Sequence, residues 1–332
     1  MSLQSGKLPH RLLRRMIRYS GARDKSVILG PRIGEDAAAI DLGEEVLILK
    51  TDPISYTAKE IGWYAVNINA NDIATMGARP KWMQTCLLVP QGMSTKEIED
   101  IFRQVDRACR SLGIAVTGGH TEINPWLDRP IIVGDMHGIC KKKDLVLSSG
   151  ARAGDAIVLT KGAGIEGTAT IAREKRAHLL RKFSKALIRR AENYLYDPGI
   201  SVVNEAMIGA RLGATAMHDP TEGGVLVGLY EIAEASGKGL LVDADEIIVG
   251  KETEKLCEFF GLDPLGLLGS GALLVVLPRR KVDAYLDELR KEGVRGSEIG
   301  EMKHKNCGLK LVSDGKTRPL RFSQRDEILK VL

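Results

Sequence analysis

The sequence predicts a mixed α/β protein with two domains, and three observations lead to this class. Segments with helical spacing alternate with short, apolar, strand-like runs along the chain. The 332 residues exceed the size that a single hydrophobic core usually serves. A small and polar stretch, SSGARAGD at residues 148–155, is typical of a domain boundary. We therefore expect one domain over residues 1–150 and a second over residues 151–332.

The first half is expected to contain three helices and at least four strands, because its apolar residues alternate between the spacing typical of helices and the spacing typical of strands. Ser94 is the expected cap of one helix, and Gly77 with Pro80 is expected to end another. The expected helices lie near 8–19, 58–76 and 95–112, and the expected strands lie at 46–50, 82–89, 114–117 and 130–139.

The second half continues the alternation, with strands expected at 156–160 and 214–217 and helices at 199–212 and 225–236. A further helix is expected to begin near Glu166. Between Arg173 and Arg190 the chain carries eight basic residues and one acid, on a predicted amphipathic helix. This basic stretch is interpreted either as a solvated face or lid, or as a surface that recognises an anionic substrate or partner.

The composition is that of an ordinary globular protein, with 44% hydrophobic and 27% charged residues. No apolar run approaches the ~20 residues that a membrane-spanning helix needs, and the first residues lack a secretory signal pattern. We expect a cytoplasmic protein without membrane contact. The net charge of +5, with 43 acids interspersed, excludes a global nucleic-acid-binding surface. Five cysteines without a C-x-x-C pair indicate neither disulfides nor a zinc site.

Three aspartates occur in short motifs: Asp36 in GEDAA, Asp52 after Thr51, and Asp72 in NANDIATMGA. They are separated by 16 and 20 residues, so they can meet only in a folded site, where they repel each other unless a hard cation joins them. Asp36 and Asp52 lie near strand ends, where α/β proteins tend to bind ligands. Mg²⁺ suits such carboxylates together with phosphate oxygens. Scattered surface acids are the alternative.

The helix expected over residues 58–76 contains Asn67 and Asn71, one turn apart on one face. Asparagine is a poor helix former, so a functional reason for its presence is expected. We interpret these side chains as polar groups aimed at a ligand. A helix-ending role for Asn71 and Asp72 is the alternative.

The GGHTE motif at 118–122 follows a predicted strand. Its glycines, Gly118 and Gly119, allow backbone N–H groups to approach phosphate closely. We consider these amides and Glu122 stronger candidates for ligand contacts than His120. A plain strand-exit turn is the alternative. His120 is open to three interpretations, as a ligand, a base or a structural hydrogen-bonding group.

The HDPTEGG motif at 218–224 places Asp219 at a strand end and Thr221 as a possible helix cap before Gly223 and Gly224. A helix N-terminus offers free N–H donors and favours an anion such as phosphate. An ordinary capped helix start is the alternative. The catalytic residues are not identified, and His120 and His218 are the two candidates.

Taken in this order, GEDAA, TD, NANDIATMGA, GGHTE, LTKG at 159–162 and DPTEGG resemble the AIR synthase-like, or PurM-like, ATP-binding superfamily over nearly the whole chain. The resemblance implies a homodimer in which the N-terminal mixed sheets pair, with ATP in a groove beside that interface. It implies Mg²⁺ held by Asp36, Asp52 and Asp72, with Asp219 added from the second domain. The expected ATP and phosphate contacts are Asn71, Gly118, Gly119, Thr121, Glu122, Lys161, Thr221, Gly223 and Gly224.

Among the branches of this superfamily, DPTEGG is most similar to the hydrogenase-maturation proteins, which end in a cysteine that accepts a carbamoyl group. Here the last cysteine is Cys307 and the chain ends at Leu332, so that chemistry is not carried over. The resemblance implies an ATP-dependent enzyme that phosphorylates an amide-type or phosphate oxygen of an unassigned substrate, an anionic or amide-bearing small molecule or a partner protein. A thiamine-monophosphate kinase-like phosphotransferase and a non-catalytic nucleotide-binding accessory protein are the alternatives.

Overall fold

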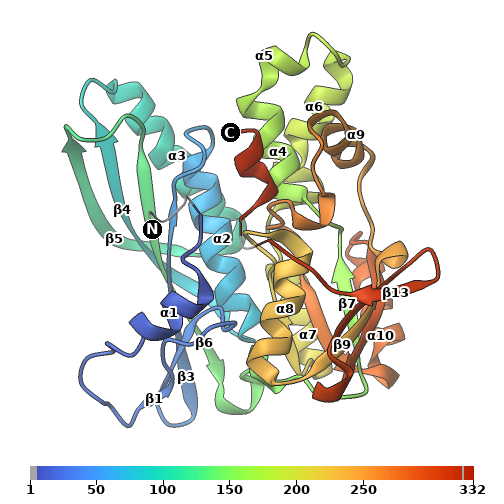
Figure 1. Cartoon of the computed structure of the whole chain (residues 1–332). Helices are drawn as coiled ribbons and strands as arrows, with labels where there is room; N and C mark the ends of the chain where they lie inside the picture. Colours follow the sequence, from blue (N-terminus) through green and yellow to red (C-terminus); the bar gives the residue numbers. More distant parts are fainter. Residues whose placement is uncertain (1–5, 324) are drawn as a thin grey trace.

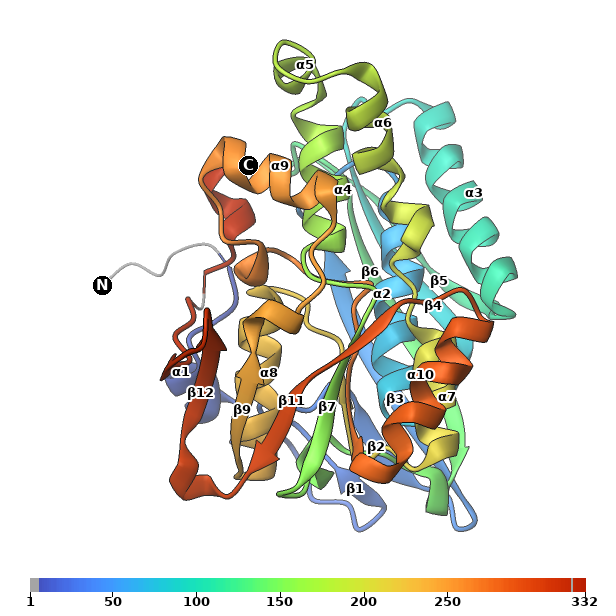
Figure 2. The same cartoon turned by 90° about the vertical axis from the view of Figure 1, so that its right-hand side faces the viewer.

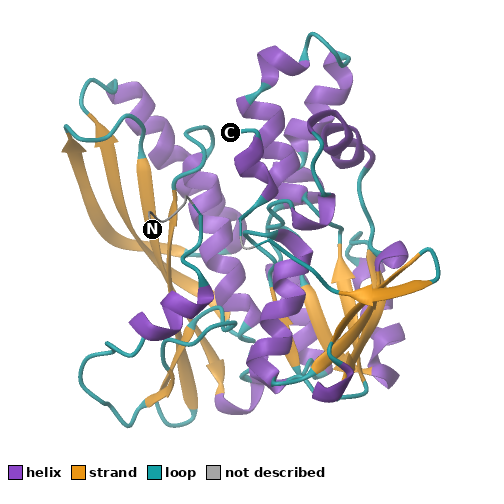
Figure 3. Cartoon of the chain, viewed as in Figure 1, coloured by secondary structure: helices purple, strands orange, loops and turns teal. Residues whose placement is uncertain are grey.

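The structure, a computed structural model of the chain, describes residues 6–323 and 325–332. It contains two β-sheets, each accompanied by helices, so the predicted mixed α/β class is confirmed (Figures 1 and 3). Every strand of the first sheet precedes Lys142 in the sequence, and every strand of the second sheet follows Gly154.

The first sheet has six strands in the order β1-β2-β3-β6-β4-β5. Neighbouring strands are antiparallel, except for the parallel pair β4 and β5 at one edge. Its strands are β1 (Val27–Leu29), β2 (Ala38–Asp41), β3 (Glu45–Ile54), β4 (Arg79–Pro90), β5 (Ala115–Asn124) and β6 (Ile131–Lys141).

Three helices accompany this sheet: α1 (His10–Met16), α2 (Ile61–Thr75) and α3 (Thr95–Leu112). The predicted cap of α3 is confirmed, because Ser94 and Glu97 form a reciprocal capping box. Helix α2 approaches β6 so closely that a Cβ on Gly138 would lie 2.3 Å from the side chain of Ile73. Glycine is therefore needed where the helix crosses this strand.

The second sheet has seven strands in the order β13-β12-β9-β11-β7-β10-β8. Its strands are β7 (Asp155–Thr160), β8 (Ala216–His218), β9 (Gly239–Asp243), β10 (Leu274–Pro278), β11 (Gly296–Lys303), β12 (Leu309–Ser313) and β13 (Lys316–Pro319). Its α-helices are α4 (Ile165–Glu174), α5 (Arg176–Leu179), α6 (Lys185–Asn193), α7 (Val203–Leu212), α8 (Gly224–Ser236), α9 (Lys251–Phe260) and α10 (Val282–Lys291). Short 3-10 turns include η2 (Ser148–Gly150), η7 (Lys305–Cys307) and η8 (Glu327–Lys330).

Helix α2 lies between the two halves and packs on strands β3 and β6 on one side and on helix α7 on the other (Figures 1 and 2). Every residue of α2 except Trp63 is buried. One continuous apolar cluster includes Ile73 of α2, Met136 of β6 and Val275 of β10. The two halves therefore share a core, and the polar residues of α2 lie inside it.

The basic stretch was predicted wrongly as one helix. It folds instead into the end of α4, the short α5 and the separate helix α6. Ser184 begins α6, because its side chain accepts a hydrogen bond from the amide of Leu187. This capping signal was present in the sequence and ends any continuous helix at that point.

Two further boundaries differ from the sequence-based expectation. Residues 118–122 lie within strand β5 rather than in a turn after it. Helix α7 begins at Val203 rather than near residue 199, because the side chain of Asn71 engages the carbonyl of Ile200 and the amide of Val202.

All five cysteines are free thiols, as the sequence predicts. Within residues 6–323 and 325–332, none of the helices has both the length and the apolar composition that crossing a membrane requires.

Candidate functional site

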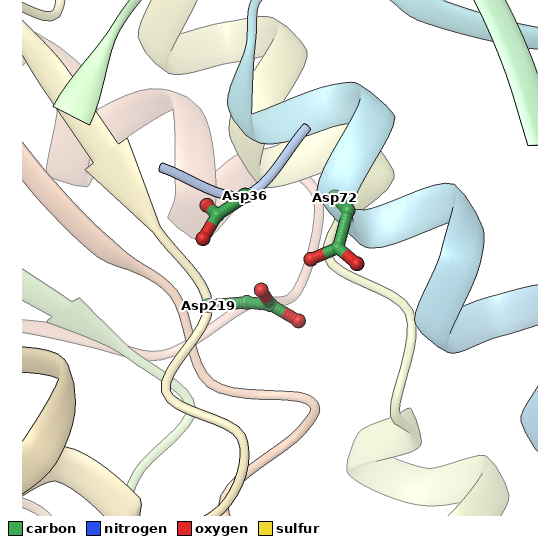
Figure 4. A group of neighbouring side chains, drawn as sticks. All are labelled: Asp36, Asp72 and Asp219. Carbon is green, nitrogen blue, oxygen red and sulfur yellow. The ribbon is translucent and has the colours of Figure 1, made fainter. Parts of the chain in front are cut away.

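Three aspartates from distant parts of the sequence converge between the two halves (Figure 4). Asp36 comes from the loop before β2, Asp72 from the last turns of α2 and Asp219 from the segment after β8. One carboxylate oxygen from each lies within 4.8 Å of the others, and all three residues are buried. The loop of Asp36 is held in place because the neighbouring Glu35 accepts hydrogen bonds from two amides of η2.

Asp219 is the most deeply buried aspartate of this cluster and the one with the fewest hydrogen-bond partners in the described part of the chain. It is 1% exposed, and neither of its carboxylate oxygens accepts a hydrogen bond from any group within the described part of the chain. Burial, with the nearby charge of Asp36, raises the pKa of Asp219 to about 6. An unsatisfied buried carboxylate is costly, and a cation is the partner that removes this cost. The oxygen-only donor set suits a hard cation such as Mg²⁺.

The fourth predicted metal ligand, Asp52, adjoins the cluster through a lysine. The ammonium nitrogen of Lys50 lies 2.9 Å from Oδ2 of Asp72 and 3.2 Å from Oδ2 of Asp52. Burial alone would lower the pKa of Lys50, but the charges of Asp72 and Asp52 outweigh it and raise the pKa. Asp52 and Asp72 therefore share the ammonium of Lys50, and Asp52 lies outside the group formed by Asp36, Asp72 and Asp219.

His218 connects the cluster to a second layer of charges. Its Nδ1 atom lies 2.5 Å from Oδ1 of Asp36, and its Nε2 atom lies 2.9 Å from Oε2 of Glu231 on α8. Burial alone would lower the pKa of His218, but the two carboxylates hold it well above the usual value. His218 is thus a cation between two carboxylates, and its contact with Asp36 orients that side chain. A role of His218 as a general base stays a prediction.

Residues before and at the start of α1 cover this second layer. Nζ of Lys7 lies 3.8 Å from Glu231, and Nε2 of His10 lies 3.6 Å from the same carboxylate oxygen. Lys7 also contacts the Thr221–Glu222 turn, where its Nζ donates to Thr221 and its amide donates to Glu222. Thr221, an expected phosphate contact, is thus within reach of a cation from the N-terminal segment.

The asparagines that the sequence singled out in α2 bond to backbone groups of the chain. Nδ2 of Asn71 donates to the carbonyl of Ile200, and Oδ1 accepts from the amide of Val202, both at 2.8 Å. Asn67 donates to the carbonyl of Trp63 within the helix. In the structure Asn71 links the two halves of the chain, and its expected phosphate contact stays a prediction.

Asn69, which sequence reasoning did not single out, has the role closest to the site. Its Oδ1 accepts a hydrogen bond from the amide of Asp52 at 2.9 Å, and its Nδ2 donates to the carbonyl of Ala65. Asn69 and Asn71, which point to opposite sides of α2, thereby fix the backbone of β3 at Asp52 and the segment that leads into α7.

The glycine pair opens α8 as predicted, but an internal carboxylate already occupies this helix start. Oδ2 of Asp326, near the C-terminus, accepts a hydrogen bond from the amide of Gly223. A Cβ on Gly224 would lie 2.5 Å from the carbonyl oxygen of Leu265, so close packing explains this glycine. Asp326 is the anion at this helix N-terminus in the structure, and the expected phosphate contact at Gly223 stays a prediction.

Lys161, the lysine of LTKG, is also engaged by the chain itself. Its ammonium lies 2.6 Å from Oε1 of Glu205 and 2.5 Å from the carbonyl oxygen of Ser201. Both side chains of the ion pair are nearly inaccessible to solvent. This buried ion pair supports the segment between α6 and α7, and the expected phosphate contact of Lys161 stays a prediction.

The GGHTE residues lie on β5, the exposed edge strand of the first sheet. Gly119 is needed there because a Cβ would lie 2.2 Å from the carbonyl oxygen of Thr85 on β4. His120 and Glu122 are exposed side chains 3.8 Å apart. Strand β5 lies three strand spacings, roughly 14 Å, from β3, so Gly118, Gly119, Thr121 and Glu122 do not join the aspartate cluster of their own chain.

Part of the basic stretch forms a cavity of about 410 Å³ at the boundary between the halves. Lys59, before α2, faces three arginines there, and Glu192 and Asn193 complete the lining. Arg173 is held at one end, where it donates to the carbonyl of Glu192, while its buried Nε has no partner in the described part of the chain. The lining arginines are Arg173, Arg176 and Arg189.

Sequence reasoning missed Lys50, Glu231 and Asp326. A signal existed for Lys50, because residues two apart in a strand share a face, and Lys50 and Asp52 are two apart in β3. No comparable local signal existed for Glu231 or Asp326, because their partners are brought together only by the packing of α8 and of the C-terminal segment.

The fold and the site together define a class of proteins in which two α/β halves enclose a buried carboxylate cluster. The model of the AIR synthase related protein N-terminal domain matches residues 34–140, and that of the C-terminal domain matches residues 152–311. The chain belongs to the AIR synthase related protein family.

Known members place the chain near the hydrogenase-maturation proteins. It is 27% identical over 281 residues to the carbamoyl dehydratase HypE of Cupriavidus necator, covering 82% of this chain and 77% of that protein. The crystal structure of a HypE–HypF complex superimposes with a TM-score of 0.77 at 22% identity, covering 94% of this chain and 99% of that one. A HypE structure in complex with ATP has a TM-score of 0.70 at 25% identity, with 90% and 92% covered.

Proposed function

We propose that this protein is a magnesium-dependent, ATP-using enzyme that transfers a phosphoryl group to an amide-type or phosphate oxygen. The convergence of Asp36, Asp72 and Asp219 carries the proposal, because Asp219 is buried with both oxygens unsatisfied in the described part of the chain. The similarity to HypE, one structure of which holds ATP, supports the nucleotide. Bound Mg²⁺ would neutralise charge on the phosphate oxygens of ATP.

In this proposal the residues of the chain contribute positioning and charge, as is usual for phosphoryl transfer. Asp36, Asp72 and Asp219 hold the metal, and His218 orients Asp36 through its contact with Glu231. The arginine-lined cavity of Arg173, Arg176 and Arg189 holds an anionic group of the acceptor.

We further propose that the enzyme is a homodimer. Residues 115–123 of β5 are all exposed, and Val116 and Ile123 are apolar residues among them. An edge strand with unpaired backbone groups and apolar side chains favours pairing with another sheet. Pairing of the N-terminal sheets would also give Gly118, Gly119, Thr121 and Glu122 a route to the nucleotide of the partner subunit.

Calorimetry with ATP, in the presence and absence of Mg²⁺, tests the first part. We expect saturable, magnesium-dependent binding, followed by ADP release when a suitable acceptor is supplied. Absence of binding by the folded protein would refute the proposal. Binding without turnover across a broad panel of phosphorylated and amide-bearing acceptors would instead favour the non-catalytic accessory role. Light scattering after size-exclusion chromatography tests the dimer.

A further inference from the structure

The position of Lys50 indicates how many divalent ions the site accepts. Its ammonium lies 2.9 Å from Asp72 and 3.2 Å from Asp52, so one positive group bridges two carboxylates. Bridging converging carboxylates is the task of a hard cation in such sites. Lys50 is only 19% exposed, so its ammonium belongs to the interior of the site.

The lysine is fixed in this position by the sheet. Strand β3 pairs with β2 on one side and β6 on the other, where Lys50 is opposite Met136 and Asp52 is opposite Gly134. Asn69 also holds the amide of Asp52 at 2.9 Å. A register slip by one residue would turn Lys50 and Asp52 to the other face together, so the pair is a built-in feature of the strand.

The charged side chains of the cluster favour one bound divalent ion instead of two. Asp36, Asp52, Asp72 and Asp219 bring four carboxylates, and Lys50 neutralises one of them. The ammonium of Lys50 therefore supplies positive charge on the Asp52 side of the cluster, where a second divalent ion would otherwise be needed.

We infer that Lys50 takes the place of one divalent cation in this site. The ammonium bridges the carboxylates of Asp52 and Asp72. The one remaining divalent site is formed by Asp36, Asp72 and Asp219. The inference rests on the proposed function, because it specifies how that metal site is filled. The competing interpretation is that Lys50 is a placeholder that leaves when a second ion enters.

Counting bound Mn²⁺ by electron paramagnetic resonance, with a saturating non-hydrolysable ATP analogue, separates these interpretations. We expect Lys50→Met to bind one more Mn²⁺ per chain than the wild type. Lys50→Arg should keep the wild-type number, and so should Lys50→Met combined with Asp52→Asn, which removes the carboxylate that an additional ion would use. Lys142→Met is the matched control, because it breaks the exposed pair with Asp41 on the same sheet.

An unchanged Mn²⁺ count in folded Lys50→Met would overturn the inference and leave the proposed function intact. Failure of the wild type to bind any Mn²⁺ with the analogue would instead refute the proposed function. Should Lys50→Met not fold, the wild type without nucleotide decides, because the inference allows one Mn²⁺ per chain at the aspartate cluster. Two ions there would show that Lys50 is displaced.

Discussion

The side chain of Asn71 holds the amide of Val202 at 2.8 Å, across the boundary between the two halves of the chain. Because Asn71 directly precedes Asp72 in α2, this bond sets where one carboxylate of the cluster lies relative to the second sheet. The alignment of the candidate metal site therefore depends on a residue that contacts only backbone.

Replacing Asn71 by alanine should lower the free energy of unfolding by roughly 2–4 kcal/mol, because it leaves the buried carbonyl of Ile200 and amide of Val202 without partners. Urea denaturation measures this change. Asn306→Ala, at an exposed position in η7, is the control and should change stability little. Equal midpoints for both variants would show that the link contributes nothing.

Replacing Asp219 by asparagine should stabilise the metal-free protein, because the amide removes a buried charge that has no partner in the described chain. The same change should abolish the increase in melting temperature produced by Mg²⁺ and ATP, which for a ligand at 100 times its Kd corresponds to about 2.7 kcal/mol. Thermal melts with and without ligand test both effects. Asp128→Asn, at an exposed position, should retain the ligand-induced shift, and a retained shift in Asp219→Asn would remove Asp219 from the site.

Glu166 on α4 should make stability depend on pH. Burial raises the pKa of Glu166 to about 8, above the value of 4.5 expected in the unfolded chain. Between pH 4.5 and 8 the folded state keeps a proton that the unfolded state has lost, so its contribution to stability falls by roughly 1.4 kcal/mol per pH unit as pH rises. Below this window both states are protonated, and above it both are ionised.

The Glu166→Gln variant removes this dependence, so its stability relative to the wild type should grow from pH 4.5 to pH 8 and then level off. Chemical denaturation across this range provides the measurement, with exposed Glu258→Gln as the control. A difference that stays constant with pH would contradict the prediction.

Lys161→Met should destabilise the protein by about 3–5 kcal/mol, because it leaves the carboxylate of Glu205 buried without its cation. Replacing Glu205 by leucine in the same variant should restore much of the stability. ATP affinity of the folded Lys161→Met protein should stay at the wild-type value. A variant with normal stability and lost ATP affinity would instead support the phosphate-binding role that the sequence indicates.

Arg189→Ala should weaken binding of inorganic phosphate to the arginine-lined cavity about tenfold, as loss of one charge-assisted hydrogen bond implies. Arg181→Ala is the matched control, because Arg181 belongs to the same basic stretch but does not line the cavity. Calorimetry at low ionic strength measures both affinities. Equal losses in the two variants would indicate general surface electrostatics instead of a defined anion site.

Much of the fold could be predicted from the sequence, because its signals are local. Ser94 as the expected cap and the regular spacing of residues 95–112 predicted α3 with its correct bounds. The basic stretch was predicted wrongly because its charges suggested one amphipathic face, while the capping signal at Ser184 received no weight.

Less of the candidate site than of the fold could be predicted from the sequence. The motifs predicted four aspartates for metal binding, and three of them converge in one cluster. Motif chemistry also indicated Asn71, Lys161 and Gly223 as phosphate contacts, yet each bonds to its own chain. The groups that engage them, Val202, Glu205 and Asp326, are distant in sequence, and only the packing of the halves brings them near.

The exposed edge strand β5 affects how the newly made monomer behaves before it assembles. Nine consecutive exposed residues, from Ala115 to Ile123, present an open ladder of backbone groups to any extended segment nearby. A freshly synthesised monomer is thus vulnerable to unspecific strand addition until another surface covers that ladder. If a second copy provides the cover, the contact that shields this edge strand from aggregation also completes the nucleotide site, so a variant that cannot dimerise should be both more prone to aggregation and less active.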